Sequence, residues 1–176
     1  MDFTTFTVAE LLQMHAGVID ELVSRGVVRT GNNPIGDYTE WLVCDRLELE
    51  LQPNSRASYD GVDSNGIRYQ IKGRRTKLAT GNVQLSVIRN LEQNGFDYLI
   101  AVVFNSDYTI RFAAKIPHGI LNKIATYRKH VNGHVLIIRE NILERDDVVD
   151  ITNLINSATS RPFQSPTTNA SQISKP

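Results

Sequence analysis

Hydrophobic side chains near the start of the chain recur at the three- and four-residue spacing of an α-helix. The residues that form this stripe are Leu11, Leu12, His15, Val18, Ile19 and Leu22. Thr7 and Glu10 have the spacing of a capping box, which fixes the first turn of a helix, and Gly26 can end it. The pattern therefore predicts an N-terminal helix over residues 7–25.

A second helical pattern covers residues 36–51, and Pro53 would stop it. Its apolar stripe is formed by Val43, Cys44, Leu47 and Leu51. Glu40 lies at the centre of this stripe, and Asp37 lies near it at the helix start. A carboxylate among apolar side chains is costly unless it is paired or bound to a metal. Glu40 is therefore either in an ion pair, with an arginine such as Arg56, or a metal ligand.

The rest of the chain alternates between strand and helix patterns. Residues 56–62 and 67–74 predict a hairpin, and the continuous apolar run 97–104 is typical of a strand that is buried on both faces. The remaining expected elements are a short strand or loop and then a short helix over 82–93, a strand over 108–116, a helix over 117–128, a strand over 134–139 and a helix over 148–155.

This order of elements predicts an α/β fold in which helices flank a central mixed β-sheet. We expect one domain over residues 1–156, with its core at 36–139. Residues 157–176 are rich in Ser, Thr, Asn, Gln and Pro, so they predict a flexible tail.

The predicted hairpin brings chemically active side chains onto one face. A three-residue loop over 64–66, with its glycine in the left-handed conformation, sets the register, whereas a four-residue loop would shift it by one. The expected pairs are Asp63 with Ile67, Asp60 with Gln70, and Ser58 with Lys72. A carboxylate, an amide oxygen and an ammonium group can then converge, as a magnesium site that hydrolyses a phosphodiester requires. The alternative is an exposed polar face of an edge hairpin.

Charge is balanced over the whole chain but not within it. The formal net charge is zero, yet residues 64–91 contain six basic residues and no acidic residue. Such a region can neutralise backbone phosphates, although a solvated basic surface has the same composition. Because it adjoins the hairpin, we expect five of its side chains to contact DNA: Arg68, Arg74, Arg75, Lys77 and Asn82.

Other residues narrow the class of protein. The single Cys44 excludes an internal disulfide, and the chain lacks a signal-peptide pattern and an apolar run of membrane-spanning length, so we expect a cytoplasmic protein. His130 and His134 have no cysteine partners and do not predict a zinc site. Three aromatic residues suit either base stacking or core packing: Trp41, Tyr59 and Tyr69.

The order of Glu40 on a helix, Asp60 at a strand end and then Gln70-Ile71-Lys72 resembles the PD-(D/E)XK nuclease superfamily, which includes restriction endonucleases and Holliday-junction resolvases. Gln70 is similar to the glutamine that often replaces the second acid in Mrr-type restriction endonucleases. The resemblance covers residues 36–104 and implies a restriction-endonuclease-like core.

The resemblance also implies a role for each residue. Asp60 would be the principal ligand of Mg²⁺, for which Mn²⁺ would substitute. Glu40, Gln70 and the carbonyl of Ile71 would complete the metal shell, and Lys72 would offset charge that develops on the phosphate. Because Gln70 brings no charge, a two-metal mechanism is in doubt.

The sequence therefore predicts a magnesium-dependent endodeoxyribonuclease of restriction or repair type. A homodimer would be needed to cut both strands. One alternative is a catalytically weak module on the same fold that binds DNA or a partner protein. Another is a structural or immunity-type protein in which Glu40 and Asp60 form only internal ion pairs.

Overall fold

A computed structural model describes residues 2–53, 58–77 and 81–157. It divides into two compact units, which are described here over residues 2–34 and 35–157. The expected single domain over 1–156 stays a prediction, and the expected flexible tail lies outside the described residues apart from Ser157.

The first unit contains the predicted N-terminal helix, α1 (Val8–Ser24). The hydroxyl of Thr7 accepts a hydrogen bond from the backbone N–H of Glu10, whose carboxylate accepts one from the N–H of Thr7 at 2.8 Å. Arg25 caps the C-terminal end, and Gly26 follows with φ +67°. Both the helix and its capping box are confirmed, because each end has the side chain or glycine that it requires.

The second unit contains two sheets. Its strands are β1 (Glu50–Leu51), β2 (Gly61–Val62), β3 (Arg68–Arg75), β4 (Val83–Gln84), β5 (Tyr98–Phe104), β6 (Ile110–Pro117), β7 (Ala125–Arg128), β8 (Gly133–Ile138) and β9 (Val149–Asp150). Its α-helices are α2 (Ile35–Arg46), α3 (His118–Ile124) and α4 (Thr152–Asn156), and its 3-10 helices are Leu91–Gln93, Lys129–Val131 and Glu140–Glu144.

The larger sheet has the strand order β1-β2-β3-β5-β6-β9, and the smaller has the order β4-β8-β7. Only β3 and β5 pair in parallel, so the large sheet is mixed. The predicted α/β class with a mixed sheet is confirmed. The predicted strand over 97–104 is also confirmed, because six consecutive residues of β5 are buried.

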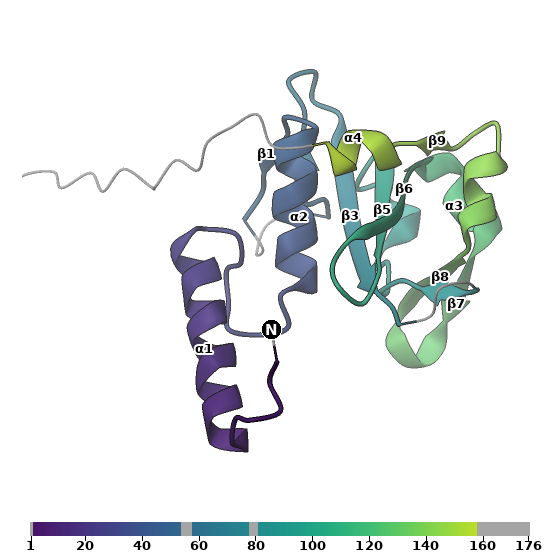
Figure 1. The fold of residues 1–176 in the computed structure, drawn as a ribbon. Helices are drawn as coiled ribbons and strands as arrows, with labels where there is room; N and C mark the ends of the chain where they lie inside the picture. The colour runs from purple at the N-terminus through teal and green to yellow at the C-terminus, as the bar shows by residue number, and fades with distance from the viewer. Residues whose placement is uncertain (1, 54–57, 78–80, 158–176) are drawn as a thin grey trace, which may run out of the picture. The chain divides into compact units, whose positions relative to one another are not determined.

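The two faces of the large sheet have separate cores (Figure 1). On one face, side chains of α2 and α4 pack against the strands; residues of this core include Leu42, Val43, Tyr69, Ile71, Ile100, Val102 and Ile155. On the other face the small sheet and α3 cover the strands; residues of this core include Leu85, Ile88, Leu99, Ala101, Val103, Leu121, Leu136 and Ile138. Successive residues of a strand point to opposite faces, so β5 contributes to both cores.

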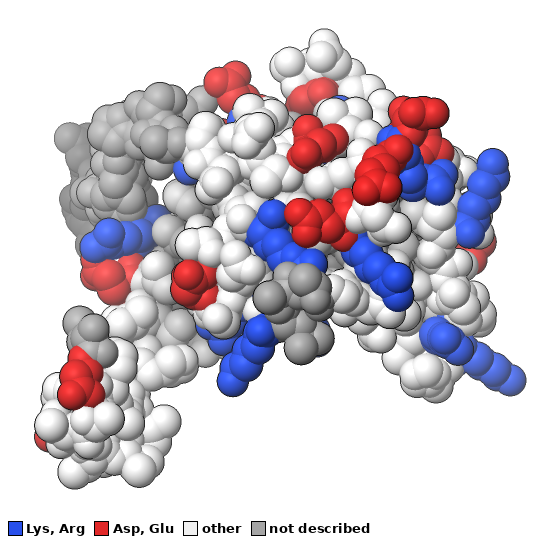
Figure 2. Space-filling model, turned by 45° about the vertical axis from the view of Figure 1, so that its right-hand side comes forward, with Lys and Arg blue, Asp and Glu red and all other residues white. Residues whose placement is uncertain are grey.

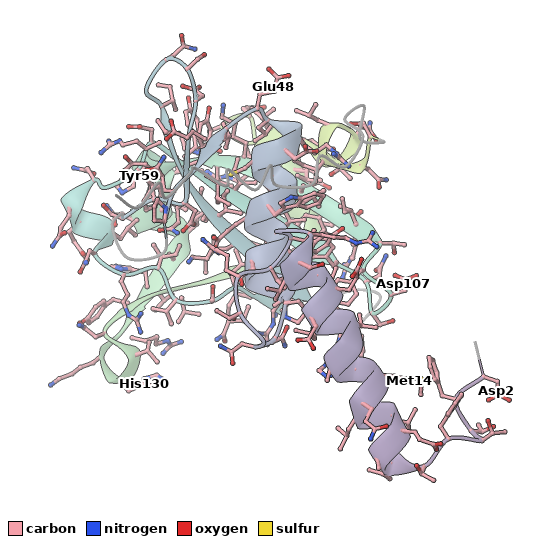
Figure 3. The ribbon with its side chains drawn as sticks, turned by 90° about the vertical axis from the view of Figure 1, so that its left-hand side faces the viewer. Asp2, Met14, Glu48, Tyr59, Asp107 and His130 are labelled. Carbon is pink, nitrogen blue, oxygen red and sulfur yellow. The ribbon has the colours of Figure 1, made fainter. Side chains whose placement is uncertain are left out.

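Helix α2 is shorter than the sequence predicted, because it ends at Arg46 rather than at Leu51. Glu48 adopts a left-handed φ of +54° and projects outward at the end of α2 (Figure 3), and the N–H of Leu49 donates to the carbonyl of Cys44 at 2.9 Å. This hydrogen bond closes a helix C-terminus. Residues 50–51 then pair with β2 instead of continuing the helix.

Two other predicted helices are partly strand. The helix predicted over 117–128 ends at Ile124, and residues 125–128 form β7, which pairs with β8. The helix predicted over 148–155 begins only at Thr152, because residues 149–150 pair with β6. Strand pairing has overridden helical spacing in both segments, with the nearby β8 in the first and with the distant β6 in the second. Within the described ranges, no helix is long and apolar enough to span a membrane.

Candidate functional site

The turn of the predicted hairpin has the expected form. Gly66 has φ +81°, and the N–H of Asp63 donates to the carbonyl of Ile67 at 3.0 Å. The carboxylate of Asp63 accepts hydrogen bonds of 2.9 Å from the N–H groups of Asn65 and Ile67. Desolvation raises the pKa of Asp63, but these bonds outweigh it and leave the pKa below its ordinary value. The three-residue loop is confirmed.

The register that this loop sets is confirmed as far as Gly61, and Asp60 meets Gln70 through its side chain rather than as a ladder pair. The ladder between β2 and β3 pairs Gly61 with Tyr69 and Val62 with Arg68. One residue further back, the N–H of Asp60 donates to the carbonyl of Tyr69 at 2.8 Å. Beyond Asp60 the chain leaves β3, so the predicted pair of Ser58 with Lys72 does not form. Ser58 lies instead beside Gly95, where an added Cβ would come within 2.4 Å of it.

Where the ladder between β2 and β3 ends, the side chain of Asp60 forms the next hydrogen bonds to β3. Its Oδ2 accepts a hydrogen bond of 2.6 Å from the backbone N–H of Ile71 and another from the side-chain amide of Gln70. The backbone carbonyl of Asp60 accepts from the N–H of Gln52 at 2.9 Å, so the residue is fixed on both sides. Asp60, Gln70 and Ile71 are therefore brought together as predicted.

These residues offer oxygen ligands of the kind that Mg²⁺ prefers. Both hydrogen bonds end on Oδ2 of Asp60, which leaves Oδ1 to bind an ion. The N–H and C=O of an extended residue point to the same edge of a strand, so the carbonyl of Ile71 lies on the edge that Asp60 occupies. A rotation of the Gln70 amide would exchange its nitrogen for its oxygen toward the carboxylate. The donor set is hard and contains no thiolate or imidazole, so it fits Mg²⁺ better than Zn²⁺.

The charge of this donor set is low. Among the residues that the structure describes, no three His, Cys, Asp or Glu side chains gather in a group that could hold a metal ion. Asp60 is the one carboxylate that contacts Gln70 and Ile71 there, because the described contacts of this group involve no other acid. An ion at this site would therefore depend strongly on Asp60.

Lys72 lies on the same face of β3 as Gln70, since the two residues are two apart in one strand. Its side chain is half-buried, and within the described ranges it forms no ion pair or hydrogen bond through its side chain. Desolvation of a charged amine is unfavourable unless another group compensates for it. Among the described residues, Lys72 thus has no partner for its charge, and its contact with a phosphate stays a prediction.

Glu40 belongs to a helix that covers the opposite face of β3. Helix α2 packs against Ile71 and Gly73, and an added Cβ at Gly73 would be 1.9 Å from Oγ1 of Thr39. Gln70 and Lys72 point away from this helix because they alternate with Ile71 and Gly73. Glu40 is half-buried, and its role as a metal ligand stays a prediction.

The predicted DNA-contact residues fall into two groups. Arg74, Arg75 and Lys77 are exposed at the end of β3, where the guanidinium of Arg75 lies 4.6 Å from the ring centroid of Tyr108. Arg68 instead forms an ion pair of 3.0 Å with Asp97 at the start of the strand. This hydrogen-bonded pair holds the pKa of Asp97 below its usual range.

Asn82 accepts a hydrogen bond from Arg139 on the small sheet. On the face that Figure 2 shows, basic and acidic side chains are interspersed rather than gathered in one basic patch. The structure therefore concentrates the free positive charge of the predicted contact residues at the end of β3, and the DNA contacts themselves stay predictions.

The aromatic and histidine side chains take part in packing. Trp41 and Tyr59 pack against the two cores, and Tyr69 is buried, which favours core packing over base stacking. His134 is buried 3.4 Å from a carboxylate oxygen of Glu92, whereas His130 is exposed and projects from the tip of the β7–β8 hairpin (Figure 3).

The hydroxyl of Tyr69 donates to Asp63 at 3.1 Å, and its ring stacks on Tyr98 with 5.8 Å between centroids. Lys115 lies over both rings. Desolvation, followed by the hydrogen bond to Asp63, raises the pKa of Tyr69 to about 12. The buried phenol therefore holds the turn against the sheet.

Sequence reasoning missed the contact between Thr39 and Gly73, which fixes α2 against β3 next to Lys72. Thr39 is fully buried, and its hydroxyl donates to the carbonyl of Ile35. A glycine within a strand often marks close approach of another segment, so Gly73 was a signal for this contact.

No protein-family model matches the sequence, and a search of curated proteins found no significant match.

Proposed function

We propose that this chain is a magnesium-dependent endodeoxyribonuclease of restriction or repair type, built on a restriction-endonuclease-like core over residues 36–104. The observation that carries the proposal is the position of the Asp60 carboxylate. It occupies the gap where β2 leaves β3 and contacts both Gln70 and the backbone of Ile71. Lys72 follows on the same face as Gln70, half-buried and without a carboxylate partner among the described residues.

Each residue has a separate task in this proposal. Asp60, the amide oxygen of Gln70 and the carbonyl of Ile71 would hold Mg²⁺. Glu40 lies on the helix that covers the opposite face of β3, so it would complete the shell through water. The bound ion supplies a Lewis acid and lowers the pKa of a coordinated water. Lys72 places a positive charge where negative charge develops on the phosphate, which lowers the barrier because the charge is already in position.

The exposed basic side chains at the end of β3 would hold the DNA backbone. Arg74, Arg75 and Lys77 lie within five residues after Lys72, so they would meet phosphates close to the scissile bond. Such contacts favour all DNA sequences alike, because a phosphate carries no sequence information. A homodimer would be needed for cleavage of both strands of a duplex.

The test is a cleavage assay on plasmid, linear and branched DNA with Mg²⁺, Mn²⁺ or EDTA. We expect cleavage by the wild type with either metal, and loss of cleavage in Lys72→Ala and Asp60→Asn. Asparagine is the better replacement at Asp60, because its oxygen can still accept the hydrogen bond of Ile71 that alanine would leave unmade. Lys123→Ala, on α3, is the matched control and should cut normally. Full cleavage by Asp60→Asn would overturn the site.

Metal binding can be measured apart from cleavage. If Glu40 is a ligand, Mg²⁺ should raise the thermal midpoint of the wild type, and Glu40→Gln should reduce that shift. Equal shifts in both proteins would assign Glu40 to an ion pair instead.

One observation favours the second candidate, a catalytically weak binding module on the same fold. Gln70 donates its amide to Asp60 and adds no negative charge to the donor set, which weakens attraction for a cation. Such a module would bind DNA equally in Mg²⁺ and in EDTA and would cut none of the substrates. Binding of a protein partner without DNA affinity would point to the partner-binding form of this alternative.

A further inference from the structure

Two hairpins of the large sheet turn through three residues, and the last residue of each loop has a left-handed backbone. In the turn from β2 to β3 this residue is Gly66, with φ +81°. In the turn from β5 to β6 it is Tyr108, with φ +67°. The N–H of Asn105 donates to the carbonyl of Thr109 at 2.8 Å, which closes the second turn. The same form of turn therefore contains a glycine in one hairpin and a tyrosine in the other.

The backbone conformation of Tyr108 is unfavourable for its residue type. In the left-handed region a Cβ crowds the backbone, so glycine or asparagine is usual at this loop position. The turn is held by Asp107, whose carboxylate accepts hydrogen bonds from the N–H and the hydroxyl of Thr109 at 3.0 and 2.6 Å (Figure 3). These bonds do not involve the tyrosine side chain. A bulky side chain at a strained position indicates that its ring contributes something that glycine would not.

The ring of Tyr108 contacts both an aromatic cluster and a cation. Its centroid is 6.0 Å from the ring of Tyr38 and 6.3 Å from the ring of Phe104. The guanidinium of Arg75 lies over it, 4.6 Å from the centroid, where the ring quadrupole attracts a positive charge. Among the described residues, the side chain of Arg75 forms no ion pair or hydrogen bond. The tyrosine ring is therefore the contact that orients this guanidinium.

Arg75 and Arg74 leave β3 on opposite faces. Arg74 pairs with Val103 of β5, which belongs to the core beneath the small sheet and α3. Arg75 pairs with Phe104, which belongs to the core beneath α2 and α4. Paired residues of neighbouring strands point to the same face of a sheet. Lys72 lies on the face of Arg74, so Arg75 would reach a different phosphate from the one that Lys72 faces.

We propose that Tyr108 is a positioning residue that presents the guanidinium of Arg75 to a DNA phosphate beside the scissile one. This inference rests on the proposed function, because it requires that the end of β3 meets DNA. A guanidinium that is already held in one orientation loses less side-chain freedom when it binds a phosphate. The contact carries no sequence information, so it favours every DNA sequence alike.

A double-variant cycle of duplex binding, measured in EDTA to prevent cleavage, tests the coupling. Tyr108→Asn removes the ring but keeps a residue that tolerates the left-handed backbone. It should weaken binding about two- to fivefold, which is the factor expected for an exposed cation–π contact. In the Arg75→Ala background the same change should have no further effect. In the Arg74→Ala background, the matched control, it should keep its full effect.

Three further measurements separate positioning from folding. Tyr108→Phe keeps the ring and should bind DNA like the wild type. In DNA-free protein, nuclear magnetic resonance should show Arg75 side-chain protons shifted to higher field by the ring current of Tyr108, and Tyr108→Asn should abolish that shift. In steady-state cleavage Tyr108→Asn should raise KM and leave kcat unchanged, because Arg75 lies away from the scissile phosphate. Circular dichroism shows whether each variant keeps its fold.

Four results would overturn the proposal. Equal weakening by Tyr108→Asn with and without the Arg75 side chain would mean that the ring acts through the fold or on DNA directly. The absence of a ring-current shift in the wild type would remove the contact itself. A fall in kcat with unchanged KM would place Arg75 at the scissile phosphate. A wild type that binds no DNA would overturn the proposed function as well, whereas DNA binding that is insensitive to Tyr108 would overturn this inference alone.

Discussion

Replacement of Gly73 by alanine tests how closely α2 is held against β3. A Cβ at this position would lie 1.9 Å from Oγ1, 2.8 Å from Cβ and 3.0 Å from Cγ2 of Thr39. Thr39 is fully buried and cannot swing into solvent, so helix and strand must separate. Gly73 has no positive φ, so an alanine causes no backbone strain there. The effect of the substitution is therefore one of packing.

The expected cost follows from two opposing contributions. Overpacking of a well-filled core costs about 1–3 kcal/mol. The reduced entropy of the unfolded chain returns about 0.4–1 kcal/mol for a change from glycine to alanine. Gly73→Ala should therefore lower the free energy of unfolding by about 1–2 kcal/mol. Because Lys72 is the preceding residue, cleavage by the folded variant should fall as well.

Denaturant unfolding followed by circular dichroism measures this change. Thr39→Ala removes Oγ1, the closest atom, and Cγ2, but leaves Cβ at 2.8 Å, so the double variant should be more stable than the sum of the single effects by about 1 kcal/mol. Gly119→Ala is the matched control, because nothing lies within 4 Å of its added Cβ. It should be neutral or stabilising. Wild-type stability of Gly73→Ala, or strict additivity in the double variant, would refute the close contact.

Three further predictions concern the site and its surroundings. Gln70→Glu adds a negative charge beside the ion, so it should lower the Mg²⁺ concentration for half-maximal cleavage roughly fivefold, which corresponds to about 1 kcal/mol. Gln70→Ala should raise that concentration. An unchanged concentration in both variants would show that Gln70 is not a metal ligand. Neutralising Arg74 and Lys77 should reduce the salt slope of DNA binding by roughly one to two units for every sequence, as filter binding at several salt concentrations would show; an altered sequence preference with the same slope would indicate base readout. Burial raises the pKa of Tyr69 from 10.0 to about 12, so the folded protein binds this phenol proton more tightly than the unfolded chain does. The free energy of unfolding that depends on the proton is therefore complete below pH 10.0 and is lost as the pH rises toward about 12. The stability difference between wild type and Tyr69→Phe should shrink over that range in urea melts, and a constant difference would contradict the shift.

Local signals in the sequence were sufficient for the elements that depend on local chemistry. Thr7 with Glu10 specifies the start of α1, and the loop ending in Gly66 specifies the register that pairs Gly61 with Tyr69 and brings the side chain of Asp60 to Gln70. The buried strand β5 is evident from its unbroken apolar run. In each case a few neighbouring residues determine the backbone.

Features that depend on distant partners could not be predicted in the same way. Leu51 fits the helical stripe of α2, but it pairs with Gly61 in the sheet instead. Because the sequence pattern assigned Leu51 to this helix, it placed Glu40 at the centre of an apolar face that is longer than the face of α2 in the structure. Residues 149–150 likewise become strand because they pair with the distant β6. The side of β3 that a helix covers is a tertiary property, so the place of Glu40 relative to Lys72 could not be obtained from spacing alone.

The hydrogen bond from the Ile71 N–H to Asp60 makes this backbone amide a probe of the Asp60 carboxylate. Amides inside a β-ladder exchange with deuterium slowly because neighbouring strands hold them. The amide of Ile71 is held on that edge by Oδ2 of a carboxylate, whose other oxygen is the one that would bind a cation in the proposed site. Its exchange rate and its nuclear magnetic resonance frequency therefore follow the state of a single side chain. Binding of a metal ion at the proposed site would then be detected at one backbone proton, without a substrate and without any turnover.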